Sequence, residues 1–315
     1  MAVQVVVRAA WLVVSLWLAS VLVFAVVNIL PGDVAAVILG TNATPQALDT
    51  LRHQLGLDQP AWLRYVQWLA GMLHGDFGTS VLSHADVGTL ILQKLSVSGP
   101  LALASAAIAI VVALPLGVLA GTHYRNGLGA LISGASLLGI AIPAFWAGLL
   151  LVTVFAIGLR LLPAGGFSDW SVDPGAALRS LVLPSVALGL VQAAVLTRYV
   201  RSAIIDVQRE DFIRTARAKG LSRWQALRRH GFRFAAIPVV TILGVQLTGL
   251  LVGAIVIENV FVLPGLGRLL FQSVGNRDLL VVQDLVMLLT AVVLVVNFLV
   301  DLTYRLLDPR IRATA

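Results

Sequence analysis

The chain has no cysteine among its 315 residues, so a disulfide framework and thiolate chemistry are excluded. Charged residues are also scarce. They make up 12% of the sequence, whereas a soluble domain carries about 25%. Apolar residues make up 59%, and the mean hydropathy is +0.95. This composition predicts an integral membrane protein in contact with the lipid bilayer.

Several chemical motifs are missing as well. The only lysines are Lys94 and Lys219, and neither lies in a G-x-x-x-x-G-K-[ST] motif, so the chain has no P-loop. The five histidines show no H-E-x-x-H spacing, and no G-x-S-x-G is present. We therefore expect no catalytic residue, no metal site and no cofactor bound by this chain. Any energy from ATP must come from a partner.

What the sequence has in excess is long apolar runs. A helix needs about 20 residues to cross a bilayer, and six runs approach or exceed that length. They are residues 9–30, 97–120, 128–159, 181–199, 234–260 and 280–304. Pro143 interrupts the third run, and Pro31-Gly32-Asp33 ends the first. The sequence thus predicts an all-α fold with six transmembrane helices.

The runs divide the chain in two. Residues 1–95 would hold the first transmembrane helix and an extracytoplasmic segment, in which Thr44-Pro45 and Pro60 each begin a helix. Residues 96–315 would form a five-helix core. Lysine and arginine are concentrated in the segments between spans that lie on the same side of the membrane as the amino terminus. This bias predicts that both termini are cytoplasmic. The basic residues flank the spans rather than forming a stripe, so the net charge of +7 does not indicate a nucleic-acid partner.

The most polar stretch within the core lies between the fourth and fifth runs, at residues 206–233. Ala216 and Ala218 favour a helix, and Gly220 can adopt the left-handed backbone that ends one. Ser222 can cap a second helix, in which apolar residues such as Trp224 and Leu227 recur. The pattern predicts helix, glycine turn and helix, on the cytoplasmic side. We call residues 206–233 the elbow.

The elbow sequence RTARAKG resembles the EAA loop of the permease subunits of binding-protein-dependent ABC importers. Arg214-Thr215-Ala216 stand at its Glu-Ala-Ala positions, Gly220 at its glycine, and Arg233 in place of its proline. With these substitutions relative to the EAA motif, the elbow resembles that of the B-type permeases of the oligopeptide, dipeptide and nickel branch. Ordered blocks along nearly the whole chain are similar to the same branch: PGDVA, LRHQLGLDQP, GDFGTS, AIPAFW, FVLPGLGRLL and LLDPRIR.

The resemblance implies a function. The chain would be a permease subunit in a bacterial inner membrane, paired with a second homologous permease, two cytoplasmic ATPases that bind ATP and Mg²⁺, and an extracytoplasmic solute-binding protein. Its cargo would be di- or oligopeptides, with nickel chelates or glutathione as alternatives. The residues implied to couple to the ATPase are Arg214, Thr215, Ala216, Arg217, Ala218, Lys219, Gly220 and Leu221.

Polar residues in or near the spans are candidates for the translocation pathway. They are Gln192, Gln246, Glu258, Asp284 and Asn297. Such residues either face a cavity or bond across helices. Glu258 and Asp284 lie near the outer ends of their spans, so partial hydration is a further alternative for both. Asp284 would pair with Arg277 or line the outer mouth of the pathway with Glu258.

Two other functions remain open from the residues alone. A secondary transporter driven by an ion gradient would be expected to show acidic residues near the membrane midplane and an internal repeat. The acidic residues lie near the span ends, and no clear repeat is visible. A polytopic membrane enzyme is disfavoured because no catalytic set is present.

Overall fold

The computed structural model describes residues 2–29, 39, 43–54 and 56–307, and its named elements are all helices. In chain order these are α1 (Ala2–Ile29), α3 (Pro45–Gln54), α4 (Ala61–His74), α5 (Val87–Thr122), α6 (Gly127–Ala141), α7 (Ala144–Leu151), the π-helix η2 (Val152–Gly158), α8 (Pro174–Arg209), α9 (Asp211–Ala218), α10 (Arg223–Ala226), the π-helix η3 (Leu227–Gly231), α11 (Phe232–Val260), α12 (Leu266–Gly275) and α13 (Leu279–Leu307).

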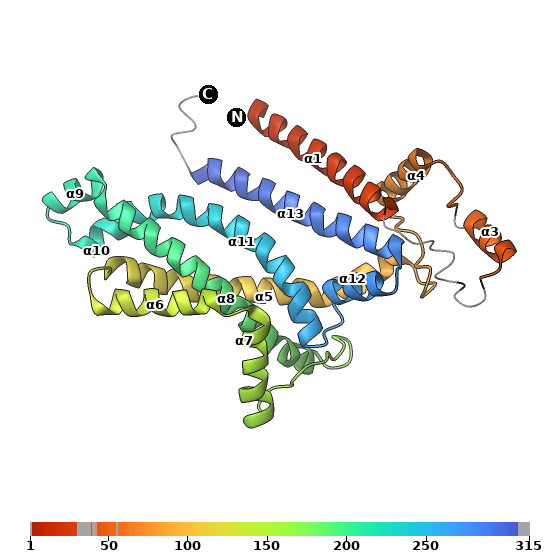
Figure 1. Ribbon diagram of the computed structural model, residues 1–315. Coiled ribbons are helices and arrows are strands. Elements are labelled where there is room, and N and C mark those ends of the chain that lie inside the picture. Colours follow the sequence, from red (N-terminus) through yellow and green to blue (C-terminus); the bar gives the residue numbers. More distant parts are fainter. Residues whose placement is uncertain (1, 30–38, 40–42, 55, 308–315) are drawn as a thin grey trace.

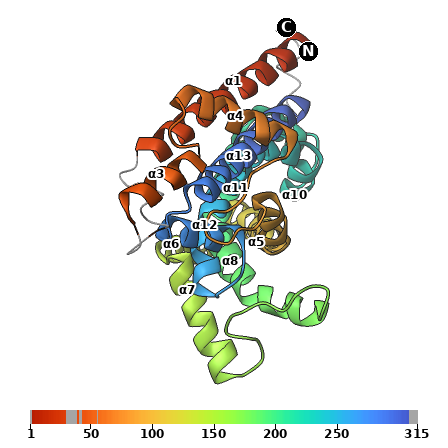
Figure 2. The same ribbon diagram turned by 90° about the vertical axis from the view of Figure 1, so that its right-hand side faces the viewer.

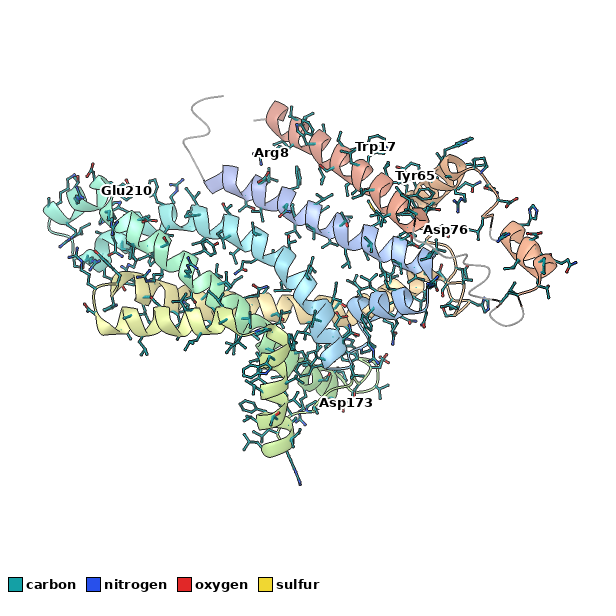
Figure 3. The ribbon with its side chains drawn as sticks, in the orientation of Figure 1. Arg8, Trp17, Tyr65, Asp76, Asp173 and Glu210 are labelled. Carbon is teal, nitrogen blue, oxygen red and sulfur yellow. The ribbon has the colours of Figure 1, made fainter. Side chains whose placement is uncertain are left out.

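The helices form an elongated bundle with two distinct ends (Figure 1). The amino end of α1, the carboxyl end of α13 and the α9–α10 segment lie at one end. Helices α3, α4 and α12 lie at the other. Figure 3 marks the same two ends by Glu210, next to α9, and by Asp76. We call them the elbow end and the distal end.

The apolar runs become long helices. Five helices among the described residues are long and apolar enough to cross a membrane, and a sixth span results if α6 and the α7–η2 helix count as one. The expected all-α fold with six spans is thereby confirmed, with one modification. The span made of α6 and the α7–η2 helix is bent by 98°, and α7 stands away from the bundle (Figures 1 and 2).

The bend falls where the sequence has Pro143. The residue before a proline is pushed out of the helical region, and Ile142 accordingly has φ −85° and ψ 118°. Helix α6 therefore ends at Ala141, and α7 begins after Pro143.

Helices α5 and α8 form the central pair of the bundle. They approach closely where one of them has glycine: a Cβ on Gly117 would lie 2.5 Å from the Cβ of Val200, and one on Gly121 would lie 2.7 Å from the Cβ of Ile204. Only glycine fits at such contacts without displacing the neighbouring helix. The pair extends from the distal end to the elbow.

The expected starts of these two spans, near residues 97 and 181, are wrong. Helix α5 begins at Val87 and α8 at Pro174, because Asp86 and Asp173 cap them by accepting hydrogen bonds from backbone N–H groups three residues on. Pro100 lies inside α5 rather than in its first turn. Hydropathy detects the apolar part of a helix but not a polar first turn.

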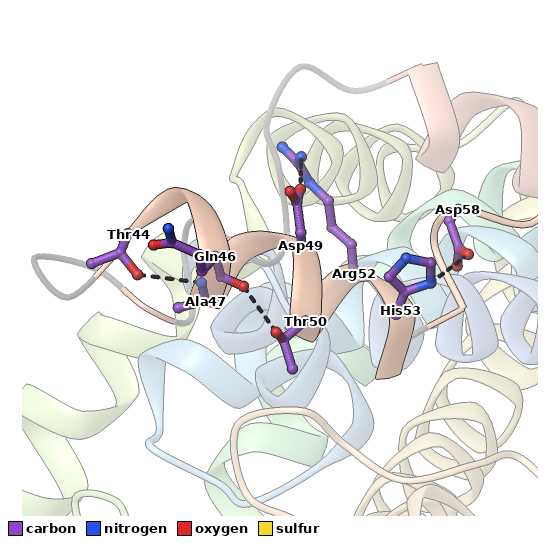
Figure 4. A network of polar contacts seen from close by, with 8 residues as sticks. All are labelled: Thr44, Gln46, Ala47, Asp49, Thr50, Arg52, His53 and Asp58. Carbon is purple, nitrogen blue, oxygen red and sulfur yellow. Dashed lines mark hydrogen bonds and ion pairs between the residues drawn. The ribbon is translucent and has the colours of Figure 1, made fainter.

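The amino-terminal helices were partly anticipated. Thr44 accepts a hydrogen bond from Ala47 N at 3.2 Å and so caps α3 (Figure 4). Pro60 precedes α4 as expected. Tyr65 of α4 packs against Phe24 of α1 with ring centroids 5.4 Å apart. Trp62 remains exposed. The break expected at 31–33 lies outside the described residues.

Candidate coupling elbow and transmembrane cavity

The elbow folds as its sequence indicates. Helix α9 is followed by Gly220 in the left-handed region, at φ +93°. The Ser222 hydroxyl then accepts from Gln225 N, and the Gln225 side chain accepts from Ser222 N. This reciprocal capping box begins α10. The prediction of helix, glycine turn and helix is confirmed.

The second elbow helix is not a separate element, contrary to expectation. Residues 223–260 form one continuous helix of 38 residues, from α10 through the π-turn η3 into α11. Gly231 lies at the junction, where a Cβ would meet Leu227 Cδ1 at 2.6 Å and Val207 Cγ1 at 3.1 Å. The chain can therefore pass close to α8 without leaving the helix.

Buried side chains fix the elbow to the bundle. Ile213 of α9 and Leu227 of η3 are buried in one apolar cluster with residues of α8 and α11. Phe212 and Phe234 add a ring contact with centroids 4.7 Å apart. The elbow is therefore packed as part of the bundle rather than as a loose loop.

The eight candidate coupling residues divide into an outer and an inner set. Six are exposed: Arg214, Thr215, Arg217, Ala218, Lys219 and Gly220. Ala216 is buried and Leu221 is half-buried against the apolar cluster, so these two shape the elbow from inside. Arg214 bonds to Asp211 at 3.2 Å, and both side chains are largely exposed. The outer set forms a basic surface at the end of the molecule.

Sequence reasoning missed a polar joint between the elbow and the α5–α6 turn. The Arg223 guanidinium donates to Gln208 Oε1 and lies 5.8 Å from the centre of the Tyr124 ring. The Gln208 Nε2 donates in turn to Gly121 O at 3.3 Å. No motif marks these residues, since the joint forms only when three distant segments meet.

Two of the pathway candidates bond to each other across helices. Gln246 Nε2 of α11 donates to Gln192 O of α8 at 3.2 Å. This is the interhelical hydrogen bond expected for amides within a membrane. Asn297 instead lines a cavity of about 580 Å³ between α1, α11 and α13, together with the Arg8–Asp301 ion pair.

Glu258 is buried, with a side chain that binds the start of α12. Its carboxylate accepts from Ser98 Oγ at 2.5 Å, from Gly267 N at 2.8 Å and from Arg268 N at 3.1 Å. A carboxylate that binds the first N–H groups of a helix satisfies donors that lack a partner within it. The alternative of partial hydration does not agree with an exposure of only 1% for Glu258.

Asp284 is completely buried. The indole of Trp68 in α4 donates to its Oδ1 at 2.7 Å, and Oδ2 has no hydrogen-bond partner. The alternative of partial hydration does not agree with this burial either. Trp68, rather than the expected Arg277, is the donor, because α4 folds back onto α13. Asp284 lines neither the 580 Å³ cavity nor the larger cavity between α5, α11, α12 and α13.

A larger cavity, of about 690 Å³, lies between α5, α11, α12 and α13. Its walls are mainly apolar, and Glu258 is the one pathway candidate among its lining residues. Within the described residues, no group of three or more His, Cys, Asp or Glu side chains could hold a metal ion. The arrangement thus combines a partly open, mainly apolar cavity near the distal end with a basic surface at the elbow end.

Comparison with known proteins identifies the family. Residues 113–313 match the model described as "Binding-protein-dependent transport system inner membrane component", and residues 1–95 match its amino-terminal model. The chain belongs to this permease family. Its relatives are membrane components of transport systems.

Curated relatives cover almost the whole permease. A putative peptide transport system permease protein of Brucella abortus (strain 2308) is 38% identical over 97% of both chains. The glutathione transport system permease protein GsiC of Escherichia coli (strain K12) shows the same identity and the same coverage.

A solved structure supports the fold. A chain of the MetNI methionine ABC transporter, in an inward-facing conformation, gives a TM-score of 0.54 at 16% identity. The match covers 70% of this chain and 96% of that one.

Proposed function

We propose that this permease is one of two homologous membrane subunits of an ATP-driven peptide importer. Two cytoplasmic ATPases would bind ATP and Mg²⁺ and dock on the elbow, and an extracytoplasmic binding protein would deliver the cargo. Both termini and the elbow would be cytoplasmic. Residues 1–95 would form the first span and the outer segment, and residues 96–315 the five-helix core.

The observation that carries the proposal is the elbow itself. It presents exposed Arg214, Arg217 and Lys219 on a segment that is fixed to α8 and α11 by buried residues. A soluble motor can transmit movement to the spans only through a rigid surface of this kind. Family membership supports an ATPase and a binding protein as partners, and the relatives named for peptide transport support the cargo.

The proposal is tested by purification of the assembled transporter in detergent. Arg217→Ala is expected to weaken retention of the ATPase subunits and to lower ATP-dependent peptide uptake, because it removes one exposed cation from the docking surface. Arg179→Ala serves as the matched control, since Arg179 is also exposed on a helix but lies near the start of α8, at the opposite end of that helix from the elbow. Equal retention in both variants would contradict the docking role. Uptake by the chain alone, driven by a proton gradient, would favour a secondary transporter instead.

A further inference from the structure

The 690 Å³ cavity has walls that are apolar along most of their length. Leu92 and Leu103 of α5, Leu251 of α11 and Val292 of α13 are among the lining residues. On α5 alone the lining extends from Asp86 to Ala106, which corresponds to about 30 Å of helix. The cavity therefore begins at the distal end and extends along the bundle beside α5.

The charges on its walls are of one sign. Asp86 and Glu258 are the charged lining residues, and no lysine, arginine or histidine lines the cavity. The Glu258 carboxylate already accepts hydrogen bonds from Ser98 and from the start of α12. Asp86 is therefore the acidic group left to meet a ligand.

Asp86 is placed to bind a cation. It is exposed, and the two bonds that it accepts, from Thr89 N and Thr89 Oγ1, both reach Oδ1 at 2.7 Å. The hydrogen bonds from Thr89 hold the pKa of Asp86 below its ordinary value, so the group stays anionic. An ammonium group near Asp86 would be attracted to its carboxylate at the solvent-exposed end of the cavity.

We propose that this cavity is the permease's share of the cargo pathway and takes peptides with apolar side chains and no net negative charge, with the terminal ammonium held at Asp86. The inference rests on the proposed transport function. Apolar walls favour apolar side chains, but each carboxylate moved between them would lose its hydration and find no cation, so the cargo should carry no carboxylate beyond its terminal one. Glutathione, with two carboxylates and one ammonium, does not suit these walls.

The absence of cysteine makes the test direct, because Leu103→Cys introduces the only thiol of this chain. The assembled transporter, built with cysteine-free partners, is treated with a cationic or an anionic thiosulfonate of similar size. The rate at which each reagent modifies the cysteine is divided by its rate with a free thiol in solution, so that the intrinsic reactivities of the two reagents cancel. Leu138→Cys is the control, since Leu138 of α6 is similarly exposed, at 70% against 73% for Leu103, and lies outside the cavity lining.

At Leu103→Cys we expect the cationic reagent to react about tenfold faster than the anionic one, because an acidic cleft concentrates cations. Adding Asp86→Asn should bring the ratio towards one. Without the binding protein, trileucine should slow the reaction, and S-methylglutathione at equal concentration should not. The control should show neither the charge preference nor the protection.

Equal rates for the two reagents, or equal protection by both peptides, would overturn the inference. Failure of both reagents to react at Leu103→Cys would also overturn it and would indicate that lipid or a neighbouring helix fills the cavity. ATP-driven uptake is measured on the same preparations. If uptake depends on the ATPases but the cavity shows no selectivity, only this inference fails. If uptake does not depend on the ATPases, the proposed function itself fails.

Discussion

At the scale of single residues, the most constrained groups are two buried carboxylates that connect helices. Glu258 joins α11 to α5 and to the start of α12, and Asp284 joins α13 to α4. A buried charge is tolerated only with hydrogen-bond partners, and removal of a partner leaves the full cost of desolvation. Both sites therefore permit sharp tests by small substitutions.

Replacing Trp68 by phenylalanine should destabilise the protein. Trp68→Phe keeps an aromatic ring but removes the N–H that donates to Asp284 Oδ1. Leaving a buried acceptor without its donor costs about 1–3 kcal/mol, which would appear as a lower midpoint of thermal unfolding in detergent. Trp62→Phe, at an exposed position of the same helix, should change the midpoint little. Equal effects of the two substitutions would show that the Asp284 bond contributes nothing measurable.

Gly265 should not accept even a methyl group. A Cβ there would lie 2.3 Å from Glu258 Cδ, so Gly265→Ala must push the carboxylate away from the start of α12. Overpacking of this kind costs about 1–3 kcal/mol. The measurement is the unfolding midpoint, together with the protease sensitivity of α12. Gly275→Ala, at the other end of α12, meets nothing within 4 Å and is the control. An unchanged midpoint in Gly265→Ala would mean that Glu258 moves aside freely.

At the scale of elements, the elbow is a short helix turned by one glycine and continued directly into a span. Its inner face is packed against α8 and α11, and its joint with the α5–α6 turn passes through Arg223 and Gln208. The orientation of α9 is therefore set by Gly220 on one side and by these contacts on the other. Substitutions at the two places should impair coupling without unfolding the spans.

Gly220→Val should weaken ATPase docking. A Cβ at Gly220 meets nothing within 4 Å, so the cost comes from the backbone at φ +93° and not from a clash. A residue held in a left-handed conformation costs about 1–3 kcal/mol, and a β-branched residue tolerates it least. We expect Gly220→Asn to retain more uptake than Gly220→Val, because asparagine enters this region more readily. Gly134→Val in α6 also meets open space and should leave uptake near normal. Full uptake in Gly220→Val would contradict the role of the turn.

The polar joint should also matter for coupling. Arg223→Lys keeps the charge but loses the planar group that faces Tyr124 and binds Gln208. We expect several-fold lower ATP-dependent uptake at unchanged expression. Arg229→Lys, at an exposed position of η3, serves as the control. Similar uptake in both variants would show that the joint is not used in coupling.

At the scale of the whole molecule, the two ends of the bundle carry different structural features. The elbow and both ends of the described chain lie together, and α3, α4 and α12 lie at the opposite end (Figure 1). The 690 Å³ cavity begins on the side of α12. The molecule therefore separates the proposed contact with the motor from the proposed contact with the cargo.

This arrangement predicts the accessibility of tags. Protease sites added at the amino and carboxyl termini should both be cleaved in inside-out vesicles and both be protected in intact spheroplasts, because α1 and α13 begin and end on the elbow side. A site inserted after Gln54 of α3 should show the opposite behaviour. Cleavage of the two termini from different sides would contradict the arrangement.

The sequence anticipated the elements better than the contacts between them. Apolar runs and Pro143 predicted the spans and the break, and Gly220 with Ser222 predicted the elbow, because these signals act within a few residues. The partners of Asp284 and Glu258 could not be foreseen. Trp68 lies 216 residues from Asp284, and depth along a span says nothing about which helix covers a side chain.

The continuity of residues 223–260 has a mechanical consequence. A helix of 38 residues is about 57 Å long, with its first turn in the elbow and Glu258 near its far end. A continuous helix of this length can transmit movement as a lever does, and its π-turn at Leu227–Gly231 and Pro238 are the points where it would bend. If it pivots as a rod, a tilt of about 5° at the elbow swings the far end by about 5 Å. Such a swing would carry Glu258, and with it the start of α12, across the mouth of the cavity.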